Sequence, residues 1–408
     1  MRRSLHVGLF GFGNVGRELY ELLQHHAPEI HVARVCVRDG AKPRELPPAL
    51  VTTDPHAILA NPAIQCVVEL VDDADAAFSI ASQAILRGKC LVTANKRMLA
   101  EHLPGLLALQ RQHQGIVLHE AAVCGSIPIL RALDVYHGGD ALSGVEGVLN
   151  GTCNSILTHM MEDGVEYAHA LAGAQALGFA ESDPTLDVRG DDSRFKLVLL
   201  ALHAFGVVLD PRAVTCAGIQ RLRVEDLAFA RQWGLRLRLV GTLRRRDNQL
   251  AAFVVPRLVD ATHELYGVRA EHNGVVVESP SCGRQLFAGR GAGGRATGFA
   301  VLQDLRRVMA GAHAGIPKIG SFPLPQLAPD AHIEIYARMS DGDPLDAVPF
   351  ASVKRIGRAG IHRFGIGTVA LDALGAALAD PRLFVAQTPD GAVEWPAQAA
   401  PPAVEVAA

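Results

Sequence analysis

The stretch HVGLFGFGNVG, residues 6–16, decides the fold of the first third of the chain. Its apolar beginning predicts a buried strand, and from residue 14 to residue 25 apolar side chains recur at helical spacing. Three of its four glycines, Gly11, Gly13 and Gly16, follow the pattern G-x-G-x-x-G. Beyond residue 25, strand-like and helix-like segments alternate to about residue 118. Apolar strands joined by helices predict a parallel sheet covered by helices on both faces.

A G-x-G-x-x-G turn between a strand and a helix is typical of a Rossmann-type dinucleotide site. Gly11 permits a tight turn, Gly13 lets the backbone approach a pyrophosphate, and Gly16 allows close helix–strand packing. The positive end of the helix dipole then faces the phosphates. We therefore predict that the whole turn binds NAD or NADP; it comprises Gly11, Phe12, Gly13, Asn14, Val15 and Gly16. A glycine-rich turn without a ligand is the alternative.

The end of the second predicted strand bears on the choice of cofactor. Arg38 and Asp39 stand there side by side. An acidic residue at this position usually holds the ribose 2′-hydroxyl of NAD, whereas an arginine can meet the 2′-phosphate of NADP. Because Arg38 comes first, the sequence favours NADP over NAD, the alternative being that Arg38 is an ordinary solvated charge.

The composition excludes several other classes of protein. The 408 residues predict two or three domains, and the formal charge of −3 gives no long-range attraction to nucleic acid or to anionic lipid. We see no apolar run long enough to cross a bilayer and no signal peptide, so we expect a cytoplasmic protein. None of the seven cysteines forms a CxxC pair, so we expect reduced thiols.

The chain divides into four expected parts. Residues 1–138 are the predicted nucleotide-binding domain, and residues 139–295 a second, α+β domain for catalysis and dimerisation. Glycines at 289–294 predict a turn before a helix at about 296–312 that packs back on the first domain. Residues 331–395 are a candidate small C-terminal domain, and the Ala/Pro-rich residues 396–408 a disordered tail.

Two lysines stand out by position. Lys96 follows Thr93 by three residues at the carboxyl end of a predicted strand, where ligands gather in open α/β sheets. Lys196 lies on a strongly apolar helix, where lost solvation favours its neutral form, as proton transfer near neutral pH requires. Asp192 precedes it by four residues and shares its helix face. The alternatives are a solvated Lys96 and an ordinary Asp192–Lys196 ion pair, worth about 0.3–0.5 kcal/mol.

An acidic segment leads into this helix. Five carboxylates fall within twelve residues: Glu181, Asp183, Asp187, Asp191 and Asp192. Such a cluster repels itself unless it holds a cation, lysines or an ammonium group, and an amino-acid substrate would supply the ammonium. A hydrated loop or a divalent metal site is the competing interpretation, although the spacing is not that of an EF-hand.

Over about residues 5–310 the chain resembles homoserine dehydrogenases. The matching stretches occur in the same order: VCVRD (35–39), VVEL (67–70), TANK (93–96), EAAV (120–123), LNGT (149–152), AESDPT (180–185), DVRGDD (187–192) running into Lys196, and GAG (291–293). Many short matches in the right order are far more specific than any single motif.

The resemblance implies an NAD(P)-dependent enzyme that interconverts L-homoserine and L-aspartate 4-semialdehyde. Lys196 would transfer the proton at the substrate hydroxyl, with Lys96 and Asp192 beside it as further catalytic residues. Glu181 would bind the substrate amino group. We assign other substrate contacts to Asp183, Asp187, Gly151 and Thr152. Cofactor contacts beyond the glycine turn and Arg38 would come from Thr93, Lys96 and Gly293.

Family members also bind a monovalent cation, and many carry a regulatory domain. The cation, Na⁺ or K⁺, would be held by the Glu120 side chain and by backbone oxygens at positions matching Val123, Gly125 and Ile127. Homodimers are usual. Many members have a C-terminal ACT-type domain, and residues 331–395 have the approximate size of a degenerate one. Inhibition by threonine is a hypothesis on that basis.

One departure from the family pattern keeps other functions open. Where members commonly have Gly-Gly soon after Glu69, this chain has Asp72 and Asp73, whose charges could weaken dinucleotide binding. The first alternative is an NAD(P)-dependent oxidoreductase for a related amino-acid or aldehyde substrate. The second is a catalytically silent nucleotide-binding regulator, against which the retained lysines and carboxylates argue.

Overall fold

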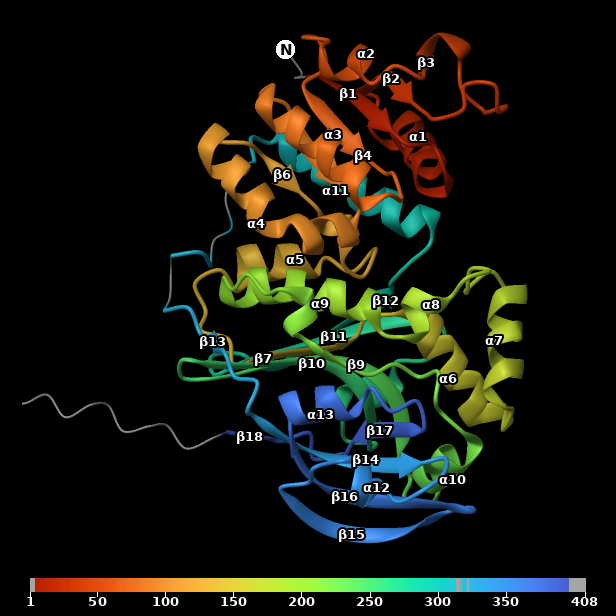
Figure 1. Ribbon diagram of the computed structural model, residues 1–408. Coiled ribbons are helices and arrows are strands. Elements are labelled where there is room, and N and C mark those ends of the chain that lie inside the picture. Colours follow the sequence, from red (N-terminus) through yellow and green to blue (C-terminus); the bar gives the residue numbers. More distant parts are fainter. Residues whose placement is uncertain (1–3, 313–315, 317, 321–322, 396–408) are drawn as a thin grey trace, which may run out of the picture.

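The chain folds around two sheets stacked along the long axis of the molecule (Figure 1). The computed structural model describes residues 4–312, 316, 318–320 and 323–395. The amino-terminal part contains a parallel six-stranded sheet, and the rest of the chain builds a larger, mixed sheet with helices on it. The predicted fold class, a Rossmann-type sheet followed by a second α+β part, is confirmed.

The first sheet has the strand order β3-β2-β1-β4-β5-β6, with all neighbours parallel. Its strands are β1 (Leu5–Phe10), β2 (Ile30–Cys36), β3 (Val51–Thr52), β4 (Cys66–Glu69), β5 (Cys90–Thr93) and β6 (Val117–Leu118). The order reverses between β1 and β4. Loops leave this point in opposite directions, which opens a crevice at the carboxyl ends of the strands where ligands bind in such folds.

Helices cover both faces of this sheet. On one face lie α1 (Asn14–His26) and α11 (Gly294–Met309), which share an apolar cluster with Val7 and Leu9 of β1. On the other face lie α3 (Ala74–Leu86), α4 (Lys96–His113) and the short α2 (His56–Leu59). The chain therefore returns to its first sheet at Gly294, far along the sequence from the end of α1 at His26. A Cβ at Gly298 would lie 3.0 Å from Leu19 N, so glycine permits this close helix pairing.

The second sheet has the order β12-β11-β7-β9-β10-β17-β14-β16-β15. The strands of its first half are β7 (Gly144–Val148), β9 (Arg236–Arg246), β10 (Gln249–Val259), β11 (His272–Ser279) and β12 (Gly283–Arg290). The helices of this part are α5 (Ile129–Arg131), α6 (Gly151–Asp163), α7 (Tyr167–Ala176), α8 (Thr185–Val188), α9 (Asp191–Phe205) and α10 (Val224–Gln232). α6 and α9 contact β9, and α9 lies between this sheet and the first domain.

The C-terminal segment runs strand–helix–strand–strand–helix–strand. Its elements are β14 (His332–Met339), α12 (Pro344–Ala347), β15 (Ser352–Ala359), β16 (His362–Ala370), α13 (Leu371–Ala377) and β17 (Leu383–Gln387). The short strands β8 (Thr215–Cys216) and β13 (Gln326–Leu327) pair with β10, and β18 (Val393–Glu394) pairs with β14. β17 joins β10 through the pair Gln387–Arg257, so the segment continues the second sheet. A separate ACT-like domain stays a prediction, and residues 396–408 lie outside the described residues.

One predicted turn was placed too early. Glycines at 289–294 predicted a turn over that whole range, but β12 extends to Arg290 and only the residues after it form the turn into α11. Gly289 and Arg290 are held by ladder pairing with Asn273 and His272. Among the described residues, we find no helix that is long and apolar enough to cross a membrane.

Candidate active site

The glycine turn has the shape that a pyrophosphate site needs. Gly11 has φ +94°, and a Cβ there would lie 2.5 Å from Leu70 O. A Cβ at Gly16 would lie 2.9 Å from Gly11 O, so helix and strand approach closely. At Gly13, by contrast, a Cβ would meet no described atom within 4 Å. Gly13 is also the N-cap of α1 and provides no capping side chain, so the first amide groups remain available to a phosphate.

A second helix begins beside this turn. Gly293, with φ +104°, is the N-cap of α11 and likewise provides no capping side chain. A Cβ at Gly294 would lie 2.9 Å from Asn14 O, so the starts of α11 and α1 are in contact. The structure thus brings Gly293 to the glycine turn, although the two are far apart in sequence. Two helix N-termini that meet favour an anionic group between them.

Arg38 and Asp39 lie at the rim of the same edge of the sheet. Both side chains are exposed immediately after β2. Asp39 Oδ1 accepts a hydrogen bond from the backbone of Ala41 at 2.9 Å, so this carboxylate stabilises its own turn. Arg38 is exposed beside it, and which of the two side chains meets the cofactor stays a prediction.

The two lysines meet at one carboxylate. Lys196 Nζ donates to Asp192 Oδ2 at 2.7 Å and to Leu149 O at 2.6 Å. Lys96 Nζ lies 3.0 Å from the other oxygen, Asp192 Oδ1. Lys196 is only 7% exposed, whereas the side chain of Lys96 is 40% exposed. Asp192 therefore holds one buried and one accessible ammonium group side by side.

Electrostatics make this group of charges stable. Burial alone would raise the pKa of Asp192, but Lys196 and Lys96 together hold that pKa well below its ordinary value. Asp192 in turn raises the pKa of Lys96 against the effect of burial, with smaller contributions from Asp187 and Glu181. The carboxylate is ionised throughout the physiological range and can orient both lysines.

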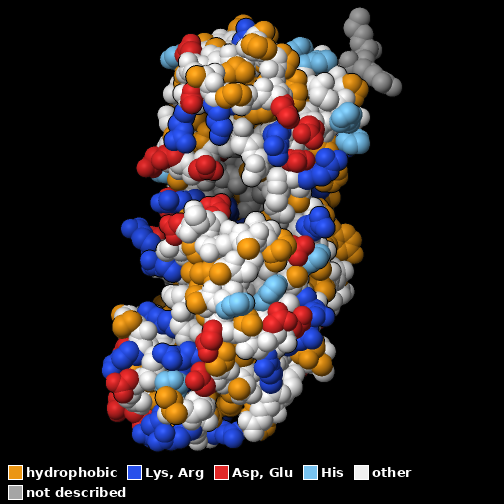
Figure 2. Space-filling model, turned by 90° about the vertical axis from the view of Figure 1, so that its right-hand side faces the viewer, with side chains coloured by type: hydrophobic (Ala, Val, Ile, Leu, Met, Phe, Trp, Pro, Cys, Tyr) orange, Lys and Arg blue, Asp and Glu red, His pale blue; other side chains and the backbone are white. Residues whose placement is uncertain are grey.

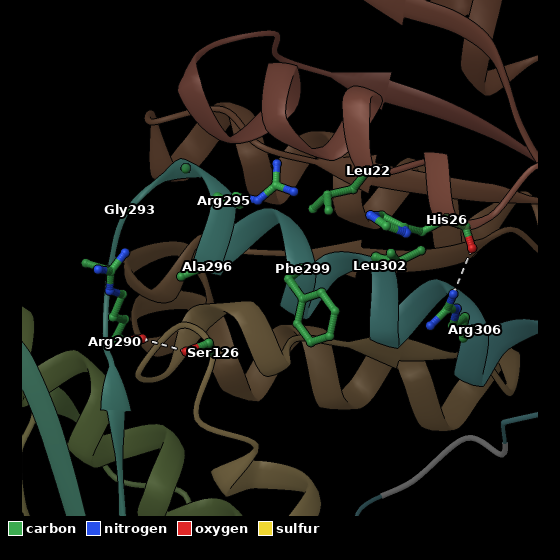
Figure 3. Close-up of a pocket in the computed structure, with 12 residues that line it drawn as sticks. Leu22, His26, Ser126, Arg290, Gly293, Arg295, Ala296, Phe299, Leu302 and Arg306 are labelled. Carbon is green, nitrogen blue, oxygen red and sulfur yellow. Dashed lines mark hydrogen bonds between the residues drawn. The ribbon is translucent and has the colours of Figure 1, made fainter. Parts of the chain in front are cut away.

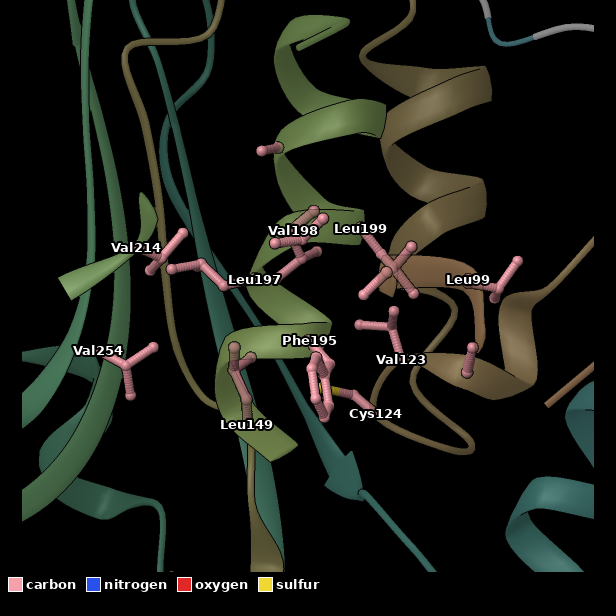
Figure 4. Close-up of a cluster of buried hydrophobic side chains, with 14 of the residues drawn as sticks. Leu99, Val123, Cys124, Leu149, Phe195, Leu197, Val198, Leu199, Val214 and Val254 are labelled. Atoms are coloured by element: carbon pink, nitrogen blue, oxygen red, sulfur yellow. The ribbon is translucent and has the colours of Figure 1, made fainter. Parts of the chain in front are cut away.

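Packing of α9 explains why the lysines come together. Figure 4 shows α9 between Val254 on the sheet side and Val123 and Leu99 on the nucleotide-domain side. Lys96 is the first residue of α4, and the N-cap Asn95 accepts from Met98 N at 2.8 Å. The buried face of α9 thus fixes Lys196, while the helix start after β5 delivers Lys96 from the other domain.

Only some of the carboxylates in the acidic segment lie at the lysine group. Asn150 Nδ2 donates to Asp187 Oδ1 at 2.7 Å and to Asp192 Oδ2 at 2.8 Å, so Asp187 joins the lysine group. Burial, together with the charge of Asp192, raises the pKa of Asp187. Glu181 is exposed, and Asp183 instead caps its own turn by accepting from Thr185 N at 3.1 Å.

Two further predicted substrate residues have local structural roles. Thr152 Oγ1 donates to Phe179 O at 2.7 Å, which holds the segment before the acidic loop against α6. Gly151 is the first residue of α6, where a Cβ would lie 2.6 Å from Glu271 O. Gly151 therefore permits a close approach of two backbones beside Asn150.

Three polar groups were missed as site residues. Asn150 holds two of the carboxylates, and Asn273 Nδ2 donates to Leu149 O at 2.9 Å, the same oxygen that Lys196 binds. Glu69 is fully buried, accepts from Thr93 Oγ1 at 2.6 Å and has a pKa raised to about 7, mainly by burial. Asn150 and Glu69 lie within stretches that resemble the family, so the signal was present for them. For Asn273 the signal was an amide beside an apolar strand.

Comparisons with known proteins agree with this geometry. Residues 11–120 match the family model described as "Homoserine dehydrogenase, NAD binding domain", and residues 128–305 match the one described as "Homoserine dehydrogenase". The chain is 38% identical to homoserine dehydrogenase of Synechocystis sp. over 318 residues, which cover 75% of this chain and 73% of that protein. The chain belongs to the homoserine dehydrogenase family.

Relatives that reach further along the chain extend the likeness to its C-terminal part. Homoserine dehydrogenase of Mycobacterium bovis is 35% identical over 373 residues, covering 86% of this chain and 84% of that protein. The structure resembles homoserine dehydrogenase from Thiobacillus denitrificans with a TM-score of 0.83 at 29% identity, covering 94% and 98% of the two chains. S. aureus homoserine dehydrogenase gives a TM-score of 0.72 at 26% identity, covering 95% and 99%.

The cation loop expected of a homoserine dehydrogenase centres on Glu120. Its two carboxylate oxygens accept from Leu130 N at 3.0 Å and Arg131 N at 2.9 Å. Burial, with a contribution from Asp304, raises its pKa to about 8. Within the described residues Glu120 forms no ion pair, and a monovalent cation beside it would favour its ionised form; such an ion stays a prediction. The loop with Val123, Gly125 and Ile127 follows directly, and Gly125 has φ +51°.

The departure at Asp72 and Asp73 has a local structural role. Asp73 is the N-cap of α3, and its carboxylate accepts from Ala76 N at 2.8 Å. Asp72 is exposed next to it. An aspartate is among the preferred N-caps, so this substitution gains a helix cap. An effect on dinucleotide binding stays a prediction.

Two hollows on the surface lie near these parts. Figure 2 shows one between the upper, nucleotide-binding part and the middle of the molecule, with acidic and basic side chains at its rim. A groove of about 650 Å³ runs along α1 and α11 from Gly293 to Arg306 (Figure 3). Neither Lys96 nor Lys196 lines that groove, so it is not the place of the chemistry.

Proposed function

We propose that this chain interconverts L-homoserine and L-aspartate 4-semialdehyde with NAD(P), as its family does. The observation that carries the proposal is the Lys96–Asp192–Lys196 group, in which lysines from two different domains share one buried carboxylate. A protein that only senses a nucleotide needs no such pair. The glycine turn at the start of α1 supports the cofactor part of the proposal.

Proton transfer falls to Lys196. During oxidation its amine takes the proton of the substrate hydroxyl, and during reduction its ammonium group returns a proton to the new alkoxide. Asp192 and Leu149 O fix the position of Nζ. Lys96, more accessible, holds the substrate oxygen from the other side. When bound, the nicotinamide supplies the hydride chemistry, and the protein supplies orientation and charge.

The substrate ammonium group is proposed to bind at Glu181 and Asp187. Asp187 already faces the lysine group through Asn150, and Glu181 is exposed near Lys96. Asp183, Gly151 and Thr152 border this position but satisfy local hydrogen bonds or backbone packing. We therefore expect these three to shape the pocket, with the two carboxylates carrying the charge recognition.

We further propose NADP as the preferred cofactor, held at its 2′-phosphate by Arg38. Thr93 and Gly293 would border the nicotinamide half and the pyrophosphate respectively. A Na⁺ or K⁺ ion would be held by the Glu120 carboxylate with backbone oxygens of Val123, Gly125 and Ile127. We also propose a homodimer, as is usual in the family.

The test follows absorbance of the reduced cofactor with purified protein, L-homoserine and either NADP or NAD, with aspartate semialdehyde for the reverse reaction. Turnover in both directions is expected. Lys196→Met should abolish turnover while NADP binding, measured by quenching of protein fluorescence, persists. Lys42→Met, at an exposed position, is the control and should remain active. Cofactor binding without turnover would overturn the proposal in favour of a silent regulator. Turnover only with a related hydroxy amino acid would show that homoserine is not the substrate.

A further inference from the structure

A histidine, an aspartate and a cysteine meet far from the lysine group. His137 and Asp140 lie in the loop after the π-helical segment Ala132–Tyr136, and Cys282 lies in the turn between β11 and β12. One ligand atom from each lies within 4.8 Å of the other two. His137 is 1% exposed, whereas Cys282 is exposed. The cluster is therefore buried at His137 and accessible to solvent at Cys282.

The ring of His137 is held between two oxygen acceptors. Its Nε2 lies 3.1 Å from Gln285 Oε1, and its Nδ1 lies 3.2 Å from Asp140 Oδ2. A neutral imidazole can donate only one hydrogen bond. A cation between Nδ1 and the carboxylate satisfies both contacts, because Nε2–H then donates to Gln285 while Nδ1 offers its lone pair; a protonated ring, paired with Asp140, is the metal-free arrangement that does the same. Metal-bound histidines commonly have such an outer hydrogen bond, which fixes the tautomer.

The carboxylate is oriented in the same way. Ser279 Oγ donates to Asp140 Oδ2, and Ser281 Oγ donates to Asp140 Oδ1 at 3.2 Å. These two serines belong to the same turn as Cys282. The loop thus supplies a nitrogen and an oxygen ligand, and the hairpin supplies the sulfur ligand and orients the oxygen ligand.

We propose that His137 Nδ1, the Asp140 carboxylate and the Cys282 thiolate bind one Zn²⁺ ion. Nitrogen, oxygen and sulfur ligands together suit zinc, with bonds of about 2.0–2.3 Å and tetrahedral geometry. Ligand atoms in that geometry are about 3.5 Å apart, so the exposed turn needs only a small closing movement. A water or Ser281 Oγ takes the fourth position. Binding releases the thiol proton of Cys282 to solvent.

This site is separate from the catalytic group. Asn273, which contacts the lysine group through Leu149 O, lies at the start of β11, and Ser279 lies at its end. Six residues of strand separate them by roughly 20 Å. The ion would join the loop after Tyr136 to the β11–β12 hairpin. Val135 and Tyr136, 70% and 67% exposed, directly precede that loop, so the ion would fix an otherwise exposed apolar corner.

The experiment titrates Co²⁺, as a coloured stand-in for Zn²⁺, into the full chain freed of metal with a chelator. We expect one Co²⁺ per chain, with the intense absorption of a tetrahedral site and a sulfur-to-cobalt charge-transfer band, both displaced by Zn²⁺. Cys282→Ser should remove the charge-transfer band, and Cys90→Ser, the matched control, should leave it unchanged. Gln285→Leu should lower Zn²⁺ affinity about 10- to 100-fold while leaving the band intact.

A second readout separates binding at this site from adventitious binding elsewhere. Zn²⁺ should raise the melting temperature of the parent chain and of Cys90→Ser, but not that of Cys282→Ser or Asp140→Asn. No charge-transfer band in the parent chain, or a band that survives in Cys282→Ser, would overturn the proposal. Because Cys282 is exposed, its substitution leaves the fold intact and homoserine turnover serves as the check of folding.

Discussion

Glu69 carries a carboxyl group that is fully buried at the carboxyl end of β4. Burial is the main cause that raises its pKa to about 7, against hydrogen bonds from Thr93 and Val71. The folded state therefore binds this proton more tightly than the unfolded chain, in which the pKa is about 4.3. This group's contribution to the free energy of unfolding is lost as the pH rises from about 4.5 to 7. Above that range the group causes no further change in stability.

Glu69→Gln should remove this dependence. Between pH 5 and 8 the parent chain is expected to lose about 3 kcal/mol through this group. The amide has no proton to release in this range; its oxygen can accept from Val71 N and its NH2 group can donate to Thr93 Oγ1. Urea unfolding at several pH values measures the difference. Glu45→Gln, at an exposed position, is the control and should follow the parent chain. Equal slopes for Glu69→Gln and the parent chain would contradict the burial argument.

Arg38 allows a test of cofactor preference at a single side chain. A charge-assisted hydrogen bond to a phosphate contributes about 1.5–3 kcal/mol, so Arg38→Ala should raise the KM for NADP about 10- to 100-fold and leave the KM for NAD nearly unchanged. Steady-state kinetics with both cofactors measure the ratio. Arg44→Ala, whose side chain donates to Lys42 O, is the control. A similar rise in the KM for NADP and for NAD would show that Arg38 does not bind the 2′-phosphate.

At the scale of elements, Gly11 and Gly13 make a matched pair at the start of α1. Gly11→Ala places a Cβ 2.5 Å from Leu70 O at φ +94°, so it should destabilise the fold by about 1–3 kcal/mol. In Gly13→Ala the added Cβ has no described atom within 4 Å, so the melting temperature of this variant should equal that of the parent chain while its KM for NADP rises. Thermal unfolding and kinetics together test this. A stable Gly13→Ala with ordinary kinetics would mean that no phosphate approaches the turn.

Elements with strong local patterns could be predicted from the sequence. The helical spacing over residues 14–25 corresponds to α1, which ends one residue later. The apolar helix predicted around Lys196 corresponds to α9, which begins with Asp191 and Asp192 and ends at the C-cap Gly206. β15 was not predicted, since nearly all its residues are exposed at the edge of the sheet. Pairing with β16, the next strand across the turn at Gly360, holds it, and a backbone ladder leaves no apolar pattern in the sequence.

The candidate site could be predicted in the same uneven way. The Asp192–Lys196 contact follows from their spacing on one helix, and the contact exists. That Lys96 reaches the same carboxylate could be expected only from the family resemblance, because it depends on how α9 packs against α4. The Asn273–Leu149 contact joins residues 124 positions apart and could not be read from local spacing.

At the scale of the whole molecule, the C-terminal segment shares its core with the catalytic part. Phe253 and Val255 of β10 belong to one apolar cluster with Ile333 and Ile335 of β14. A buried ion pair crosses the same boundary: Arg338 Nη2 lies 2.8 Å from Asp226 Oδ2, with side chains 0% and 2% exposed. Cores and charges that are shared in this way favour unfolding of the two parts together.

Arg338→Met tests that cooperativity. Among the described residues, removing the arginine leaves the buried Asp226 carboxylate with Tyr336 Oη and Arg223 N as its donors, which should cost about 3–5 kcal/mol. Arg338→Met with Asp226→Leu should recover much of that loss, because no charge is left unpaired. If the parts unfold together, homoserine turnover and circular dichroism should disappear in one transition at lower urea. An early transition that leaves turnover intact would instead mean that residues 331–395 form an independent domain.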